Sequence, residues 1–252
     1  MTKWSGTPMY LTIAQEYRKR IVQGELEPED KLPSEAELMS EFEVSRVVAR
    51  RAVDVLRNEG LVVSHPGKGS FVKKIEKITR DSSNRYSRRK AGSTSPFKRD
   101  AAKTGKTADW EHVSSRERAS QTIAKRLGIA ANDPVMRTAY RFFSESQPIQ
   151  VSDSWEPLAL TGGTSVELPE DGAATGVVAR MDLIGQHVDS VTEKVTARAA
   201  LPEEAQRLEL PAHSAYVLVI ERTHYVGDQP VETCDIIFPG DRYELTYRLP
   251  VT

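Results

Sequence analysis

The sequence predicts an α+β protein with two folded parts, the first helical and closed by a small hairpin, the second rich in strands. Three observations predict this division. Helical periodicity dominates as far as Gly60, alternating strand patterns dominate from Val135 on, and a basic stretch with few apolar residues lies between them. We therefore expect an N-terminal domain over residues 1–74, a linker over 75–106 and a C-terminal domain over 107–252.

The composition is ordinary for a globular protein, with 252 residues of which 38% are hydrophobic and 28% charged. No run approaches the roughly 20 apolar residues that a membrane-spanning helix needs, and no apolar signal core follows the first residues. We expect a cytoplasmic protein without a membrane partner. The single cysteine, Cys234, cannot form an internal disulfide or complete a Cys-based zinc site. We expect it to be buried on a strand, and we expect no metal and no cofactor.

Two helices joined by a short turn are expected in the N-terminal domain, after a first helix over residues 9–24. Ser34 and Glu37 have the spacing of a capping box, so a helix begins at Ser34. Another helix begins at Ser45, after a turn too short for anything but a sharp corner, and Gly60 ends it. This spacing is typical of a helix-turn-helix, and we expect the first helix to pack behind its second helix.

Two short strands over residues 61–64 and 70–72 follow, joined by a loop rich in glycine, and the pattern predicts a winged helix-turn-helix. Arginines at the start of the second helix suit the major groove of double-stranded DNA, and a loop tip without bulky side chains suits the backbone or minor groove. The alternative is a winged helix that makes only protein contacts. The candidate DNA-binding residues are Ser34, Ser45, Arg46, Arg50, Arg51, Gly67, Lys68 and Gly69.

The net charge of −1 hides an uneven distribution of charge along the chain. Residues 73–106 contain 12 Lys and Arg against 3 Asp and Glu, together with clusters of Ser, Gly and Thr. This composition is typical of a solvated linker. The alternative, which the sequence leaves open, is that these positive charges contact DNA phosphates and strengthen binding in a salt-dependent way.

The C-terminal domain is expected to be mixed and rich in strands. The sequence predicts two helices, over residues 118–127 and 202–208. Alternation and turn residues predict strands over residues 135–143, 149–155, 188–198, 215–225, 230–238 and 243–249.

This domain also contains a weak internal duplication, because the segments that begin at Arg126 and Arg207 align with one inserted residue. The alignment places residues 141 and 153 on residues 222 and 235 as identical pairs, two arginines and two aspartates. Each half reads as helix, loop, strand, hairpin and strand. We expect two related halves that pack together and form a cleft between equivalent strands.

Two motifs in the N-terminal domain, LPSEAELMSEFEVSR and RRAVDVLRNEGLVVSHPGKGSFV, resemble the DNA-binding domain of the GntR family of bacterial transcription regulators. The chain departs from the family at Ala36, where arginine is usual, at Glu43, where glycine is usual, and at Val47 and Val48, where threonines are usual. The first and last departures remove expected DNA contacts. Glu43 in a left-handed turn would cost on the order of 1 kcal/mol relative to glycine.

The segments RTAYRFFSESQPIQVSDSWEP and PVETCDIIFPGDRY resemble the UTRA effector-binding domain of the HutC subfamily of GntR regulators, whose fold is similar to chorismate lyase. The resemblance implies a pocket for a small molecule, commonly a phosphosugar or another small anion. A tyrosine is frequent in the family where this chain has phenylalanine at position 238. An alternative for two of the implied pocket residues is a simple ion pair between Arg141 and Glu232. The effector-binding positions that the resemblance implies are Arg137, Arg141, Ser154, Glu232 and Phe238.

Together these features predict a homodimeric regulator, a repressor that binds a palindromic operator and is released by a small, anionic effector. One alternative is a ligand-independent DNA-binding protein with a structural C-terminal domain. The other is a lyase-like enzyme fused to a DNA-binding domain, which the sequence supports poorly because it contains no nucleophile elbow, phosphate loop or His-Glu-x-x-His motif. We expect no catalytic residues, and we favour core or surface roles for His224, Trp155 and Tyr243.

Overall fold

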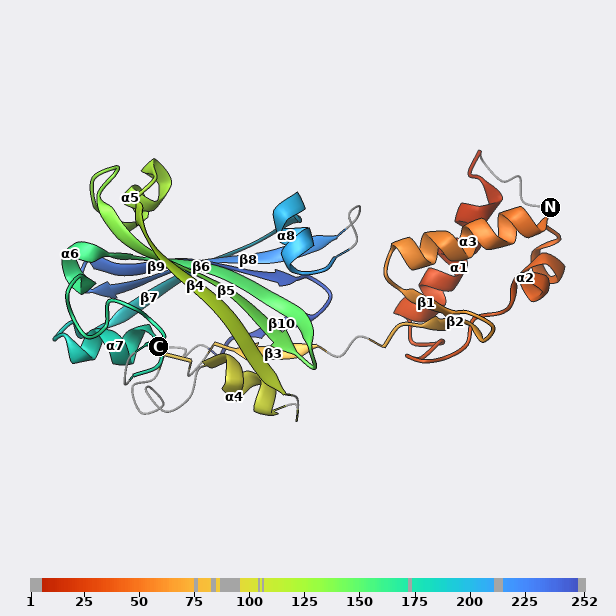
Figure 1. The fold of residues 1–252 in the computed structure, drawn as a ribbon. Helices are drawn as coiled ribbons and strands as arrows, with labels where there is room; N and C mark the ends of the chain where they lie inside the picture. Colours follow the sequence, from red (N-terminus) through yellow and green to blue (C-terminus); the bar gives the residue numbers. More distant parts are fainter. Residues whose placement is uncertain are drawn as a thin grey trace. The chain divides into compact units, whose positions relative to one another are not determined.

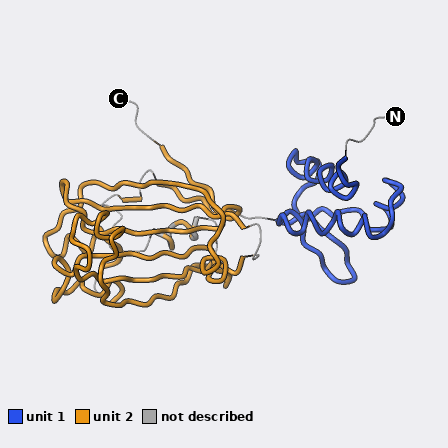
Figure 2. The backbone as a smooth tube through the Cα atoms, turned by 90° about the horizontal axis from the view of Figure 1, so that it is seen from above, with its two compact units in different colours: residues 1–76 blue, residues 77–252 orange. Residues whose placement is uncertain are grey.

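The chain folds as two compact units, residues 1–76 and 77–252 (Figure 2). The computed structural model describes residues 6–74, 77–82, 85–86, 96–103, 105, 107–171, 174–210 and 215–248. The fold class predicted from the sequence is confirmed: the first unit is a winged helix-turn-helix and the second is a mixed, strand-rich domain. Each unit is described by itself.

The first unit contains three helices and a hairpin among its described residues. In chain order they are α1 (Met9–Val22), α2 (Glu35–Phe42), α3 (Arg46–Asn58), β1 (Val62–His65) and β2 (Gly69–Val72). The strands β1 and β2 pair in antiparallel register. Apolar side chains from all three helices and both strands form one buried core, in which Ile13, Tyr17, Leu38, Ala52 and Leu56 are at most 2% exposed.

Local chemistry explains where α2 begins and ends. The Glu37 amide donates to Ser34 Oγ at 3.3 Å, and the Ser34 amide donates to Glu37 Oε2 at 2.7 Å, so the predicted capping box is confirmed. Glu43 ends the helix with φ of 54°, which confirms the left-handed turn expected at this position. Hydrogen bonds and backbone conformation at the start and at the end of α2 therefore determine where the helix-turn-helix turns.

The second unit is built on a six-stranded antiparallel sheet (Figure 1). The strand order is β4-β5-β6-β9-β8-β7. The strands β3 and β10 pair in parallel and form a separate two-stranded sheet. The described elements are β3 (Ile78–Asp81), α4 (Pro96–Lys103), β4 (Ala108–Arg118), α5 (Gln121–Leu127), β5 (Pro134–Ser144), β6 (Gln147–Pro157), α6 (Leu158–Thr161), α7 (Val177–Leu183), β7 (Ser190–Ala199), α8 (Pro202–Arg207), β8 (Tyr216–Val226), β9 (Gln229–Pro239) and β10 (Tyr243–Thr246).

The two halves of the six-stranded sheet repeat the same order of elements. One half runs β4, α5, β5, β6 and the other runs β7, α8, β8, β9, and they meet where Asp153 of β6 pairs with Asp235 of β9. Arg126 of α5 reaches Asp235 with Nη1 2.7 Å from Oδ1, and Arg207 of α8 reaches Asp153 with Nη1 3.1 Å from Oδ2. Each helix thus makes an ion pair with the other half, and both helices lie on the same face of the sheet (Figure 1).

Residues 75–106 were expected to form a linker, but their described part belongs largely to the second unit. Ile78 of β3 is 2% exposed and pairs with Tyr243 of β10. Arg80, 1% exposed, forms an ion pair with Glu193 of β7. Arg80 and Arg85 are thus buried and neutralised by carboxylates rather than solvated, which composition alone cannot reveal. Neither is free to contact DNA phosphates.

Several elements were not predicted from the sequence, namely β3, β4, α4, α6 and α7. The edge strand β4 shows why, because most of its residues are exposed or half-buried and its sequence, ADWEHVSSRER, has no clear apolar alternation. It is recognisable only through its long antiparallel pairing with β5. Four of the predicted strands, β5, β6, β8 and β9, have apolar residues facing a buried core, and that signal is visible in the sequence.

Candidate functional site

The N-terminal half of α3 presents an exposed polar surface in the first unit. The Arg46 side chain is 75% exposed and donates from Nε to Glu35 Oε2 at 3.0 Å. Arg50 is exposed, and the Arg51 guanidinium lies 4.4 Å from the centroid of the Tyr10 ring, a cation–π contact. The side chain of Ser45 makes no capping bond, so its hydroxyl is not committed to the helix end. The helix α3 is 13 residues long, and its exposed N-terminal half is the part that a recognition helix presents to base edges.

The other candidate DNA-binding residues lie in the loop between β1 and β2, called the wing, and at the start of α2. Gly67 and Gly69 have φ of 74° and 113°, so the loop requires glycine at both positions. Lys68 lies between them and is exposed. The Ser34 hydroxyl is occupied by the Glu37 amide, which makes its demonstrated role that of a helix cap. The structure therefore separates one helix cap from the seven other candidates.

Replacing Lys68 with alanine should weaken binding to all DNA sequences alike and lower the slope of log affinity against log salt by about one unit. A lysine at the tip of a glycine loop contacts phosphate as a point charge and reads no base. Binding isotherms at four salt concentrations, on operator and on unrelated duplex, measure the slope. The matched control is Lys19→Ala in the last turn of α1, and an unchanged slope for the Lys68 variant would place the wing outside the interface.

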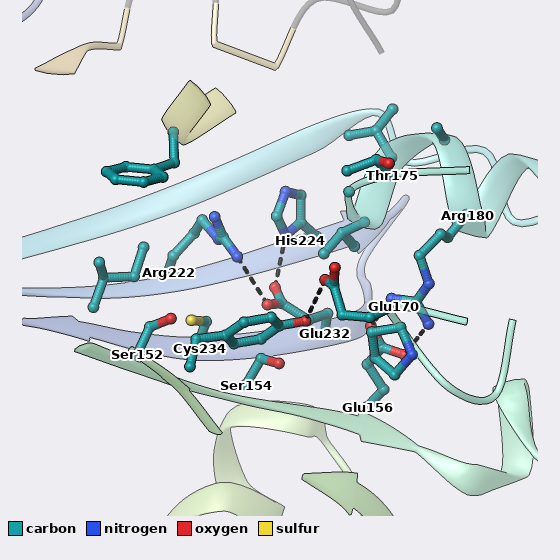
Figure 3. A pocket seen from close by; sticks show the side chains of 18 of the residues that line it. Ser152, Ser154, Glu156, Glu170, Thr175, Arg180, Arg222, His224, Glu232 and Cys234 are labelled. Atoms are coloured by element: carbon teal, nitrogen blue, oxygen red, sulfur yellow. Dashed lines mark hydrogen bonds and ion pairs between the residues drawn. The ribbon is translucent and has the colours of Figure 1, made fainter. Parts of the chain in front are cut away.

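The second unit contains a cavity of about 160 Å³ on the face of the sheet that carries α4 and α7 (Figure 3). Alternate residues of β6 face it, which are Gln150, Ser152, Ser154 and Glu156. The neighbouring strands β8 and β9 contribute Arg222, His224, Glu232 and Cys234. The period of two in a strand sends every second side chain to this face and the others to the face covered by α5 and α8.

A buried carboxylate with two basic partners lies at the centre of the cavity wall. Glu232 is 0% exposed, and its two oxygens accept from Arg222 Nη2 at 2.9 Å and from His224 Nδ1 at 2.7 Å (Figure 3). Burial alone would raise the pKa of Glu232, but Arg222 and His224 lower it to about 2. Burial and Arg222 lower the pKa of His224, so its imidazole is neutral at pH 7. Since the ionised Glu232 can only accept, Nδ1 carries the proton and Nε2 is an acceptor.

A second buried ion pair borders the cavity. Arg180 of α7 donates from Nη1 to Glu156 Oε1 at 2.7 Å and from Nη2 to Glu156 Oε2 at 2.8 Å. The two side chains are 3% and 2% exposed. Burial raises the pKa of Glu156 although Arg180 opposes this. The bidentate contact fixes α7 over the sheet and so fixes one side of the cavity.

Only two of the five effector-binding positions expected from the sequence line the cavity, Ser154 and Glu232. Arg137 pairs with Asp153, and Arg141 donates to the Arg207 carbonyl at 2.7 Å, both on the opposite face of the sheet. Phe238 is 0% exposed in the core, and its ring centroid lies 4.1 Å from that of Tyr243. The predicted cluster of Arg137, Arg141 and Glu232 is therefore not formed.

A one-residue error in the internal alignment accounts for the misplaced arginine. In the sheet, Ser152 pairs with Tyr140 and Cys234 pairs with Arg222, so the structural equivalent of Arg222 is Tyr140 and not Arg141. A shift of one residue moves a strand side chain to the other face. The alternative ion pair between Arg141 and Glu232 is excluded for the same reason.

Most cavity residues escaped the sequence prediction, among them Arg222, Arg180, Glu156 and Tyr140. Arg222 was visible as half of an aligned arginine pair, and correct placement of the inserted residue would have found it. His224, expected in a core or surface role, is 1% exposed and lines the cavity. Cys234 is buried as expected, and burial raises the pKa of its thiol, which disfavours a thiolate nucleophile.

No group of three or more His, Cys, Asp or Glu side chains among the described residues is placed to hold a metal ion. In the part of the chain that the structure describes, no helix has the length and apolar character needed to cross a membrane.

Comparison with known proteins gives this geometry a family. The family model for gntR bacterial regulatory proteins matches residues 9–72, and the model for the UTRA domain matches residues 103–244. The chain is 27% identical to the HTH-type transcriptional repressor NagR of Bacillus subtilis, over 98% of this chain and 97% of that protein. It is also 27% identical to the histidine utilization repressor of Klebsiella aerogenes, over 96% and 94%.

A solved structure supports the same assignment over the whole chain. The crystal structure of a GntR-family transcriptional regulator shares 42% sequence identity with this chain and covers 98% of it, with 99% of that chain matched and a TM-score of 0.69. Both family matches fall on the units seen here, the first on the winged helix-turn-helix and the second on the sheet with its cavity. The chain therefore belongs to the GntR family of bacterial transcription regulators, as a member with a C-terminal UTRA domain.

Proposed function

We propose that this regulator is a repressor that binds a palindromic operator as a homodimer and is released when a small anionic effector enters the cavity of the second unit. The observation that carries the proposal is the joint presence of an exposed recognition helix and a separate cavity lined by buried charged groups. The relatives named as repressors, NagR and the histidine utilization repressor, support the sign of regulation.

Two buried arginines in the cavity lining, Arg180 and Arg222, support an anionic effector. The Nε atoms of Arg180 and Arg222 are buried and have no hydrogen-bond partner among the described residues. Ser152 and Ser154, which are 4% and 7% exposed, add hydroxyls on the neighbouring strand. Arginine suits carboxylate and phosphate better than any other side chain.

An effector is expected to lower operator affinity and to depend on residues of the cavity. A tenfold loss of operator affinity requires only about 1.4 kcal/mol of preferential binding to the DNA-incompetent state. Thermal stabilisation by a panel of phosphosugars and carboxylates identifies hits, and operator titration then measures release. Ser154→Ala should weaken the binding of such a compound, whereas Arg141→Ala, on the opposite face of the sheet, should not. A hit that responds to Arg141 and not to Ser154 would place the effector elsewhere.

We expect the full chain to sediment as a dimer at micromolar concentration. Two-fold symmetric proteins place identical recognition helices on symmetric half-sites, which a palindromic operator requires. Analytical ultracentrifugation of the free protein and of its operator complex measures the stoichiometry. The full chain is the right sample, because a fragment cut at residue 107 would lack β3 and α4. A monomer in both samples would contradict the proposal.

A further inference from the structure

Residues 77–102 belong to the stretch between the two family matches, and described side chains among them line the cavity. We call residues 77–102 the connecting segment; the matches end at residue 72 and resume at residue 103. Tyr86 and Phe97 of this segment line the cavity together with residues of the sheet. Part of the cavity wall thus comes from a stretch that neither family description covers. Such a stretch is where a chain can differ from its relatives in the ligand that it accepts.

Buried contacts hold the connecting segment against the second unit. The strand β3 pairs with β10, and Arg80 donates from Nη1 to Glu193 Oε2 at 3.1 Å and from Nη2 to the Tyr86 hydroxyl at 3.1 Å. Arg85 forms an ion pair with Asp100 of α4, and the two side chains are 9% and 8% exposed. Buried contacts of Arg80 and Arg85 therefore hold Tyr86 and the helix of Phe97 in place.

The wall that the segment completes is aromatic. Phe97 is 4% exposed and its ring centroid lies 4.8 Å from that of Phe142. Phe142 in turn stacks on Tyr140 with centroids 5.6 Å apart and an angle of 18°. The Tyr86 ring meets the His224 ring edge to face at 5.4 Å. Aromatic faces and edges of this kind attract a further ring, with an energy beyond simple burial.

The size of the cavity restricts the ligand further. Its volume of about 160 Å³ is close to the roughly 150 Å³ of an engineered apolar cavity that holds one benzene molecule. A single ring with one or two small substituents fits this space.

We infer that Tyr86 and Phe97 determine effector specificity and that the effector is a planar, single-ring organic acid. Its ring packs against Phe97 and its acid group lies toward the donors of Arg222 and Arg180. The inference rests on the proposed function, since it assigns a chemical class to the anion proposed above. It adds two specificity residues from a stretch that reads as linker in the sequence.

Benzoate tests the inference, with cyclohexanecarboxylate as a non-planar acid of similar size and glucose 6-phosphate as a phosphosugar. Calorimetric titration of the full chain should show millimolar or tighter binding of benzoate, weaker binding of cyclohexanecarboxylate and weaker still of glucose 6-phosphate. Phe97→Leu keeps an apolar side chain and removes the ring, so it should weaken the binding of benzoate by about threefold to tenfold. Phe143→Leu is the matched control, because Phe143 lies under Arg141, outside the cavity lining.

Crystals soaked with 4-bromobenzoate give a readout that does not depend on a variant. The anomalous signal of bromine should lie in the cavity, with the ring against Phe97. A bromine site elsewhere, no binding of benzoate at millimolar concentration, or equal affinity for the Phe97 variant would overturn the inference. Binding of glucose 6-phosphate in the cavity that is tighter than that of benzoate would overturn the inference as well.

Operator titration separates this inference from the proposed function. Benzoate binding that depends on Phe97 but leaves operator affinity unchanged would contradict the proposed function and leave the specificity wall standing. Operator release by glucose 6-phosphate that is insensitive to Phe97→Leu would support the proposed function and exclude the aromatic wall as its selector.

Discussion

Glu232→Ala should lower the free energy of unfolding by about 3–5 kcal/mol at pH 7. The Glu232 carboxylate is 0% exposed and holds both Arg222 and His224. Its removal leaves the Arg222 guanidinium, 15% exposed, without its carboxylate in the wall of the cavity. The uncompensated charge, more than the lost contact, makes the change expensive. Urea unfolding followed by circular dichroism measures the difference.

The matched control is an exposed carboxylate that also pairs with an arginine. Glu111 lies on the edge strand β4, 64% exposed and 3.5 Å from Arg141. Exposed pairs contribute about 1 kcal/mol or less, so Glu111→Ala should be nearly silent. Equal losses for the two variants would show that the ion pair in the cavity wall has no special role in stability.

The same carboxylate makes stability depend on pH. Its pKa is about 2 in the folded protein and 4.5 in its usual state, so the unfolded chain binds the proton more readily. The stabilisation is complete above pH 4.5 and is lost as pH falls from 4.5 toward 2, on the order of 3 kcal/mol in total. Acid unfolding of the Glu232→Ala variant should therefore have a shallower dependence on pH in this window than acid unfolding of the wild type.

Arg50→Ala and Arg46→Ala should each reduce specific operator affinity by about 1–3 kcal/mol, if each arginine reads a base with two hydrogen bonds. Both lie in the exposed N-terminal half of α3. The exposed pair of Arg46 with Glu35 costs less than about 1 kcal/mol to break, so it does not prevent Arg46 from turning to DNA. Fluorescence anisotropy on operator and on scrambled duplex, at one salt concentration, measures the loss of specificity.

Arg57→Ala on the same helix is the control for those two variants. Arg57 lies in the last turn of α3, 51% exposed and 2.8 Å from Asp54. Its loss removes one positive charge from α3 but not from the half that a recognition helix presents to bases. A loss of specificity equal to that of the Arg50 variant would mean that net charge, and not position, determines binding.

Sequence predicted best what short-range chemistry decides. The capping box at Ser34, the left-handed Glu43 and the buried strands β5, β6, β8 and β9 follow from hydrogen bonding and alternation within a few residues. It failed where the partner is distant in the chain. Arg80 reads as a linker charge until Glu193, far along the sequence, is brought beside it.

The prediction of the residues that line the cavity was incomplete for a related reason. The strands β6, β8 and β9 in the cavity wall were predicted, and two of the expected effector-binding positions, Ser154 and Glu232, line the cavity. Which face an arginine occupies, however, depends on register to a single residue, and a weak internal repeat does not fix where the inserted residue falls. Strand pairing places Arg222 in the cavity and Arg141 on the far face.

The pairing of β3 with β10 has a consequence for the order of events during synthesis. The first unit has local contacts and precedes the second in the chain, so it can fold while the rest is still being made. Ile78 finds its partner only when Tyr243 emerges, after the whole six-stranded sheet has been translated. A nascent chain thus carries a finished winged helix-turn-helix well before the wall around Tyr86 and Phe97 can dock, so the cavity is completed last.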